Sequence, residues 1–153
     1  MPAPFASGVV IEALYAALAA DTTLGGLLAP YAPGFGSGPG IYEEDMVPGG
    51  ATFPYLTIGA PTEVPFNTMG VGASGGSNCT VQLKAFSKMP SRAELDAIAA
   101  AVFAVLDAVP ITVAGYGSAD CQFDLAPGDF TETVGGTRIR QLPLLYRVYV
   151  HES

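Results

Sequence analysis

The sequence is poor in charged residues. Only 13% of its 153 residues are Asp, Glu, Lys or Arg, whereas soluble domains typically carry about 25%. A surface with so few charges leaves apolar area open to association with other molecules. We therefore expect other subunits to cover much of this surface.

Basic residues are the scarcest of the charged ones. Six Lys and Arg stand against fourteen Asp and Glu, which gives a formal net charge of −8. Non-specific binding to nucleic acid requires cations that neutralise phosphates, and six scattered cations make no basic groove. We predict no nucleic-acid binding, although an acidic surface beside DNA would repel the duplex and keep it sliding.

Histidine and cysteine are nearly absent as well. The one histidine, His151, is among the last three residues, where a general base is poorly held. Cys79 and Cys121 lack the short spacing of a zinc site, so we expect buried, reduced thiols. The acidic run of Glu43, Glu44 and Asp45 points its side chains in alternate directions and forms no cation site. The composition predicts no catalytic residues, no metal and no cofactor.

Long hydrophobic runs are also missing. No apolar run approaches the roughly 18 residues that a membrane span needs. Residues 8–20 are largely apolar, but no Lys or Arg precedes them and Glu12 interrupts them, which argues against a signal peptide. We expect a protein that folds in the cytoplasm and does not contact a membrane.

Glycine is abundant and produces two motif matches. Residues 70–75 match G-x-G-x-x-G and residues 72–76 match G-x-S-x-G. Both motifs need a helix directly after them, the first to hold a pyrophosphate and the second to present a nucleophilic serine. A strand-like segment follows here, so we predict neither dinucleotide binding nor hydrolysis.

Hydrophobic periodicity predicts an α+β fold. A first helix spans residues 8–20 with Ser7 as its cap, and a short turn spans 24–29. Ser91 and Glu94 resemble a capping box for a second main helix, which Pro110 would end after about Val109. Its alanine-rich outer face reflects either helix propensity or close approach of another surface. Strands are predicted over residues 41–43, 53–58, 77–87, 111–113, 122–125, 130–133 and, after a turn at 135–136, 138–150.

This order of elements predicts one domain over residues 1–153. It contains a mostly antiparallel sheet with the two main helices packed on one face. Two Gly-rich loops, 30–40 and 60–76, interrupt the regular elements. A loop as long as 60–76 is usually functional or orders on binding.

Several segments together resemble the tail terminator, or tail-completion, family of long-tailed bacteriophages. The resemblance spans nearly the whole chain, although each piece is short and apolar. This sequence departs from the family pattern in two extra Gly-rich stretches, 34–40 and 70–76. The segments that carry the resemblance are Leu14-Tyr15-Ala16-Ala17-Leu18-Ala19-Ala20-Asp21, Ile41-Tyr42, Phe53-Pro54-Tyr55-Leu56-Thr57-Ile58-Gly59, Val81-Gln82-Leu83-Lys84-Ala85-Phe86-Ser87, the helix Ala93 to Leu106 with Ile98-Ala99-Ala100-Ala101-Val102 at its centre, and a last strand with Arg138 and Arg147.

The resemblance implies a structural virion protein at the head–tail junction. Such a protein forms a homo-oligomeric ring, typically a hexamer, that caps the head-proximal end of the tail tube and stops its polymerisation. Its implied partners are the tail tube protein and a head-completion or neck protein, with DNA passing through the lumen unbound. Assembly in the host cytoplasm would precede incorporation into the virion.

The contacts of such a ring fall on three parts of the sequence. We expect the 60–76 loop, with Phe66 and Met69 as apolar anchors, to contact the tube or a neighbour. Arg138 and Arg140 either pair with Glu43, Glu44 or Asp45 of the adjacent subunit or are solvated strand residues.

Two other functions are compatible with the sequence. The first is a neck or head-completion protein of the same particle, which copurification with filled heads instead of tubes would reveal. The second, from a different class, is a small-molecule binding or enzymatic domain, which would need a deep polar pocket.

Overall fold

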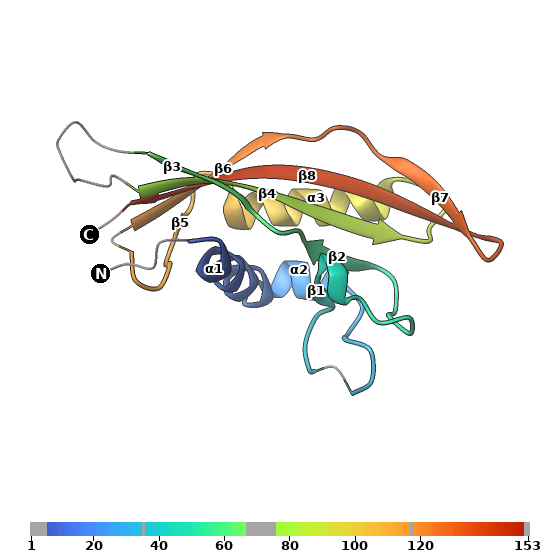
Figure 1. Ribbon diagram of the computed structural model, residues 1–153. Coiled ribbons are helices and arrows are strands. Elements are labelled where there is room, and N and C mark those ends of the chain that lie inside the picture. Colours follow the sequence, from blue (N-terminus) through green and yellow to red (C-terminus); the bar gives the residue numbers. More distant parts are fainter. Residues whose placement is uncertain (1–5, 35, 67–75, 117, 152–153) are drawn as a thin grey trace.

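The computed structural model describes residues 6–34, 36–66, 76–116 and 118–151. Its centre is a pair of long antiparallel strands, β4 (Gly76–Ser87) and β8 (Thr137–His151), which pair from Gly76 opposite His151 to Ser87 opposite Arg140 (Figure 1). From Ser77 onward, side chains along β4 alternate between buried and half-buried positions. One face of this central pair therefore belongs to the core, as the alternation in the sequence predicts.

Shorter strands flank the central pair on both sides. Strands β2 (Tyr55–Ile58) and β3 (Thr62–Phe66) pair with the two halves of β4. On the other side, β6 (Ser118–Leu125) and β7 (Phe130–Val134) pair with the two halves of β8.

The sheet ends in different strands at its two edges. Strand β1 (Ile41–Glu43) runs parallel to β2 and closes one edge, just before a 3-10 turn, η1 (Glu44–Met46). The opposite edge is formed by β7 and by β5 (Pro110–Ile111), which pairs with β6. Strands β1 and β7 therefore lie at opposite edges of the sheet.

Three helices lie against one face of the sheet (Figure 1). They are α1 (Ser7–Ala19), α2 (Thr22–Leu27) and α3 (Ala93–Leu106). Large side chains from all three helices are fully buried against the core face of β4 and β8, and each contributes roughly 1.5–3 kcal/mol of apolar burial. These side chains are Val10, Leu14, Leu18, Leu24, Leu95, Ile98, Val102 and Leu106. The predicted α+β class, with a mostly antiparallel sheet and helices on one face, is confirmed.

The ends of α3 predicted from the capping box and from Pro110 are wrong, whereas the helix 93–106 of the family resemblance agrees with the structure. The residue at the N-cap is Arg92 and no side chain caps the helix. Glu94 instead accepts a hydrogen bond from the Ser87 hydroxyl at 2.6 Å, so a strand residue takes the place of the expected box partner. The helix stops at Leu106, because Asp107 is extended and Ala108 adopts a φ of +56° before Pro110 is reached.

The predicted loop 60–76 is shorter than expected. Residues 62–66 form β3, which pairs with β4 in antiparallel register from Thr62 opposite Thr80 to Phe66 opposite Gly76. The β-branched Thr62 and Val64 favour a strand here, whereas the flanking Pro61 and Pro65 suggested a loop. Residues 67–75 lie outside the described residues, and with them most of both glycine motifs.

The turn at residues 135–136 is confirmed. Gly135 and Gly136 join β7 to β8 with φ values of +57° and +81°, the left-handed conformations that a two-residue hairpin turn requires. All residues of β7 and the first two of β8 are exposed. The hairpin therefore extends beyond the packed body of the domain (Figure 1).

Candidate interaction surfaces

Of the seven residues predicted to form contacts, six are described by the structure, and they lie in three separate places. Glu43, Glu44 and Asp45 follow one another at the β1 edge, where β1 meets η1. Arg138 and Arg140 lie on β8 within the hairpin at the opposite edge. Phe66 ends β3, and Met69 lies outside the described residues.

A groove of about 320 Å³ lies at the β1 edge, between β1 and α1. Two carboxylates, Glu12 and Glu43, line it, and no Lys or Arg does. We call it the acidic groove. Its lining residues are Ile11, Glu12, Tyr15, Tyr31, Ile41, Tyr42, Glu43 and Ile58.

Hydrogen bonds made by tyrosine hydroxyls stiffen the acidic groove. The Tyr31 hydroxyl donates to the carbonyl oxygen of Ile41 at 2.6 Å and lies 2.9 Å from the Tyr15 hydroxyl. Burial and the neighbouring Tyr15 raise the pKa of Tyr31, so its hydroxyl stays neutral and keeps its proton to donate. The Tyr42 hydroxyl accepts from the Ala32 amide at 3.0 Å. The groove is therefore a preformed, rigid surface.

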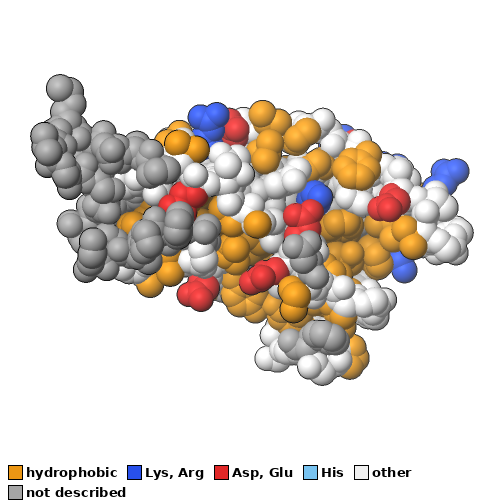
Figure 2. Space-filling view, viewed as in Figure 1, with side chains coloured by type: hydrophobic (Ala, Val, Ile, Leu, Met, Phe, Trp, Pro, Cys, Tyr) orange, Lys and Arg blue, Asp and Glu red, His pale blue; other side chains and the backbone are white. Residues whose placement is uncertain are grey.

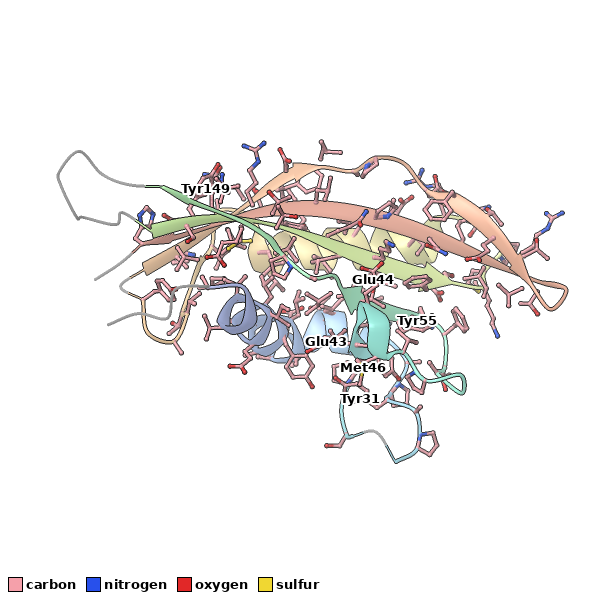
Figure 3. All side chains as sticks on the ribbon, viewed as in Figure 1. Tyr31, Glu43, Glu44, Met46, Tyr55 and Tyr149 are labelled. Atoms are coloured by element: carbon pink, nitrogen blue, oxygen red, sulfur yellow. The ribbon has the colours of Figure 1, made fainter. Side chains whose placement is uncertain are left out.

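An exposed methionine lies beside the acidic groove. Met46, in η1, is 68% exposed, the highest value among the exposed large hydrophobic residues of the described chain. Figure 3 shows Tyr31, Glu43, Glu44 and Met46 close together around β1. An apolar side chain flanked by carboxylates is a typical composition for the rim of a protein contact.

Glu44 and Glu43 differ in their partners. The Glu44 carboxylate accepts from the Lys84 ammonium at 2.6 Å, an ion pair that ties η1 to the neighbouring β4. Glu43 is exposed, and over the described part of the chain no ion pair engages it. Of the two, Glu43 is the carboxylate that is free for an external partner.

A second cavity, of about 200 Å³, lies where the β7–β8 hairpin meets the segment between β4 and α3. Three cations and no carboxylate line it. We call it the cationic cleft. Its lining residues are Lys88, Met89, Pro90, Thr131, Arg138 and Arg140.

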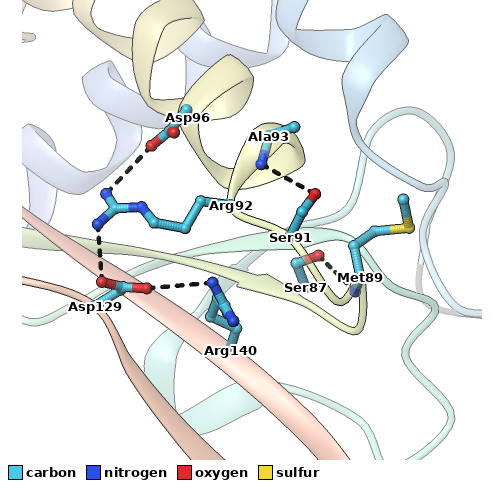
Figure 4. Close-up of polar contacts among 8 residues, drawn as sticks. All are labelled: Ser87, Met89, Ser91, Arg92, Ala93, Asp96, Asp129 and Arg140. Atoms are coloured by element: carbon cyan, nitrogen blue, oxygen red, sulfur yellow. Dashed lines mark hydrogen bonds and ion pairs between the residues drawn. The ribbon is translucent and has the colours of Figure 1, made fainter.

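A network of ion pairs fixes the base of the cationic cleft. Arg92 lies 2.9 Å from Asp129 and 3.2 Å from Asp96, and Arg140 lies 3.8 Å from the other oxygen of Asp129 (Figure 4). The network connects the start of α3 to the hairpin, two elements that are far apart in sequence. Because of its pair with Asp129, Arg140 already has a partner within its own subunit.

The two remaining cations of the cleft, Lys88 and Arg138, are exposed. The Lys88 ammonium lies 4.4 Å from the centre of the Phe53 ring, a cation–π contact that leaves its charge uncompensated. Within the described residues, no carboxylate forms an ion pair with Arg138. The exposed apolar residues Met89, Phe130 and Val134 lie on the same segments, with exposures of 49%, 50% and 53%.

The sequence predicted Glu43, Arg138 and Arg140 as contact residues but not Glu12, Lys88 or the exposed apolar residues at both edges. Met46 and Phe130 follow no period that marks them as exposed, because η1 and β7 are short. Figure 2 shows how widely apolar side chains are spread over this face of the molecule, with few charges between them. The low charged fraction of the sequence was the available signal for this surface.

Both cysteine thiols are buried within the core. Burial raises the pKa of the Cys79 thiol to about 11 and that of Cys121 to about 12, which makes both poor nucleophiles. Within residues 6–34, 36–66, 76–116 and 118–151, no three His, Cys, Asp or Glu side chains gather as metal ligands. Nor is any helix in these ranges long and apolar enough to cross a membrane.

The sequence and the fold both resemble known proteins. The family model described as tail completion protein gp17 matches residues 12–146. A chain from the virion of a native gene transfer agent particle superposes with a TM-score of 0.73 at 21% identity, covering 97% of this chain and 99% of that chain. A second solved chain gives a TM-score of 0.56 at 13% identity, covering 95% and 96%. No curated protein sequence matches the chain significantly.

Proposed function

Because the chain belongs to the family of the tail completion protein gp17, we propose that it is a ring-forming tail terminator. In this function several copies, six if it follows the related rings, close on the head-proximal end of a tail tube. The ring stops the addition of tube subunits and presents a surface to a head-completion protein. DNA crosses its lumen without being held.

The observation that carries this proposal is the family match, which covers residues 12–146 of the 153. The fold agrees with it, because a chain in a gene transfer agent virion has the same arrangement over nearly its whole length. Geometry at the two edges of the sheet adds a physical reason for a ring. The acidic groove and the cationic cleft are different surfaces on opposite edges, and a contact between different surfaces is head-to-tail and closes into a ring when its rotation permits.

Composition supports the passage of DNA through such a ring. With a net charge of −8, the subunit repels phosphate. Carboxylates of the same chain pair with three of the cations. Glu44 pairs with Lys84, and Asp129 pairs with Arg92 and Arg140. Few positive charges remain to bind a duplex.

For the contact with the tube, we propose the end of the molecule that carries β3. Val64 of β3 is 60% exposed, and the segment with Phe66 and Met69 continues from this strand. Glu63 anchors the strand to the body, since its carboxylate accepts from the Ala6 amide at 2.8 Å and from the Ser77 hydroxyl at 3.0 Å. An apolar segment on an anchored strand is suited to docking against another subunit.

The proposal is tested by polymerising the tail tube protein of the same particle with and without this chain. Added in a small molar excess over tube ends, the chain is expected to shorten the tubes and to appear in electron micrographs as a cap at one end. Tubes of unchanged length without a cap would contradict the terminator function. Copurification of the chain with filled heads in that case would assign it to the neck.

A further inference from the structure

We propose that the cationic cleft of one subunit receives the β1 edge of a second copy, with Arg138 and Lys88 facing Glu43 and Glu12. This contact rests on the proposed ring and names the residues that would hold it together. It replaces the broader expectation that Arg140 and Glu44 take part, because both already have partners in their own chain.

Complementary charge is the first support for this contact. The cleft presents three cations without a carboxylate in its lining, and the acidic groove presents two carboxylates without a cation. No ion pair within the described residues uses Arg138, Lys88, Glu43 or Glu12. The chain has six basic residues. A third of them, Lys88 and Arg138, therefore lie in this one cleft without an ion pair. Opposite potentials of this kind steer association and fix register.

The position of the two surfaces is the second support. The acidic groove lies beside β1 and the cationic cleft lies beside β7, and these strands form opposite edges of one sheet in the order β1-β2-β4-β8, with β7 on the far side of β8. The two surfaces share no lining residue. A contact between them therefore joins two copies, and each subunit then uses one surface on each neighbour, as a head-to-tail ring requires.

Apolar residues on both sides are the third support. Tyr15 and Met46 are exposed beside the acidic groove, and Met89 is exposed in the lining of the cationic cleft. These are three of the nine large hydrophobic residues that the described chain exposes. A contact with an apolar centre and charges at its rim has the usual anatomy of a protein interface.

The β7–β8 hairpin is the element that gains most from such a contact. Its residues from Phe130 to Arg138 are all exposed, and a two-stranded ribbon by itself is only marginally stable in water. The ion pairs of Asp129 with Arg92 and Arg140 hold the base of the ribbon but leave its tip free. A second subunit in the cleft would cover the face of the ribbon on which Thr133 pairs with Arg138 and Thr131 with Arg140.

A charge exchange between two variants tests the contact. Arg138→Glu places two carboxylates against each other in every interface of that variant, and Glu43→Arg does the same with two cations. Each variant alone is expected to associate at least about tenfold more weakly than the wild type. An equimolar mixture of the two is expected to assemble again. Each interface in the mixture joins either the two substituted side chains or the two native ones, in alternation, and both combinations have opposite charges.

The matched control is Arg147→Glu. It makes the same change of charge on the same strand, outside both surfaces, and removes an exposed pair with Asp124 at 3.4 Å and a side-chain hydrogen bond with Tyr149. This variant is expected to assemble like the wild type. Association is measured by analytical ultracentrifugation and native mass spectrometry, alone and with tail tubes, and circular dichroism checks that each variant is folded.

The outcomes separate this contact from the ring itself. A wild type that never assembles, with or without tubes, contradicts the ring and the contact together. A wild type that assembles while Arg138→Glu and Glu43→Arg assemble equally well leaves the ring intact and overturns the contact. A mixture that fails to recover also overturns it. So does normal assembly of Arg138→Glu combined with altered retention of DNA, which would assign the cleft to phosphate.

Discussion

At the scale of single residues, the clearest features are groups that burial keeps uncharged. Cys79 and Cys121 are fully buried and free, as the sequence predicts from two cysteines without a pairing pattern. Tyr146 is also buried, and the centre of its ring lies 5.5 Å from the centre of the Phe123 ring. Burial raises the pKa of all three groups.

These shifts predict a loss of stability at alkaline pH. In the unfolded chain a thiol loses its proton near pH 8.5, whereas the folded protein holds the Cys79 and Cys121 protons to about pH 11 and 12. The native state therefore binds more protons above pH 9, so the free energy of unfolding is constant near neutrality and falls as the pH rises toward 12. Each group contributes a slope of up to about 1.4 kcal/mol per pH unit.

Urea unfolding followed by circular dichroism at several pH values measures this dependence. The variant with Cys79→Ala and Cys121→Ala is the control. It is less stable at every pH because two buried side chains shrink, but its alkaline decline is expected to be shallower. A decline as steep as that of the wild type would show that the thiols do not cause it.

At the scale of elements, periodicity in the sequence predicted most helices and strands correctly. The stripe Val10, Leu14 and Leu18 is the buried face of α1, and the alternation along residues 77–87 is β4. Such patterns succeed because burial on one face imposes a period that no other structure satisfies. The Gly135-Gly136 turn succeeded for a similar reason, since left-handed φ values at both positions are accessible mainly to glycine.

Element ends were predicted less well, because tertiary contacts decide them. Ser91 and Glu94 have capping-box spacing, but Glu94 accepts from Ser87 and the Ser91 hydroxyl lies 3.4 Å from the Ala93 amide. The cap that does form is at α2, where the Asp21 carboxylate accepts from the Leu24 amide at 2.8 Å. A local motif cannot reveal a partner from a distant strand.

Alanine substitutions distinguish the cap at Asp21 from the capping-box pattern at Ser91. Asp21→Ala removes the acceptor of an otherwise unpaired helix amide and is expected to lower the free energy of unfolding by about 1 kcal/mol. Ser91→Ala removes no cap and is expected to cost less than about 0.5 kcal/mol. Urea denaturation of the two variants beside the wild type makes the comparison. Equal losses at both positions would contradict the assignment of the cap to Asp21.

At the scale of the whole molecule, the sequence singled out charged residues without showing the partners that the fold gives them. It pointed to Arg138 and Glu43 but not to the pairing of Arg140 with Asp129 or of Glu44 with Lys84. Each of those pairs joins two different segments of the chain, and only the fold brings them together. The exposed Met46, which lies beside the acidic groove, follows no pattern that a sequence shows.

The same scale explains the unusual composition. A subunit whose two sheet edges are covered by neighbours, and whose one end is covered by a tube, needs few charges on these surfaces for solubility. Its negative net charge is compatible with DNA passing nearby, since phosphate is repelled. In the proposed ring, low charge, opposite edges of opposite sign and an exposed hairpin would all follow from the contacts of one subunit with its neighbours.

The central claim, that this chain works as a closed ring on a tail tube, is tested most directly by its mass. Native mass spectrometry of the purified protein, alone and after incubation with tail tubes and release, measures the number of copies in the assembly. The account predicts one discrete species at a small multiple of 15.6 kDa, six copies if it follows the related rings, in at least the tube-incubated sample. A single 15.6 kDa species under both conditions, or an open-ended ladder of masses, would contradict it.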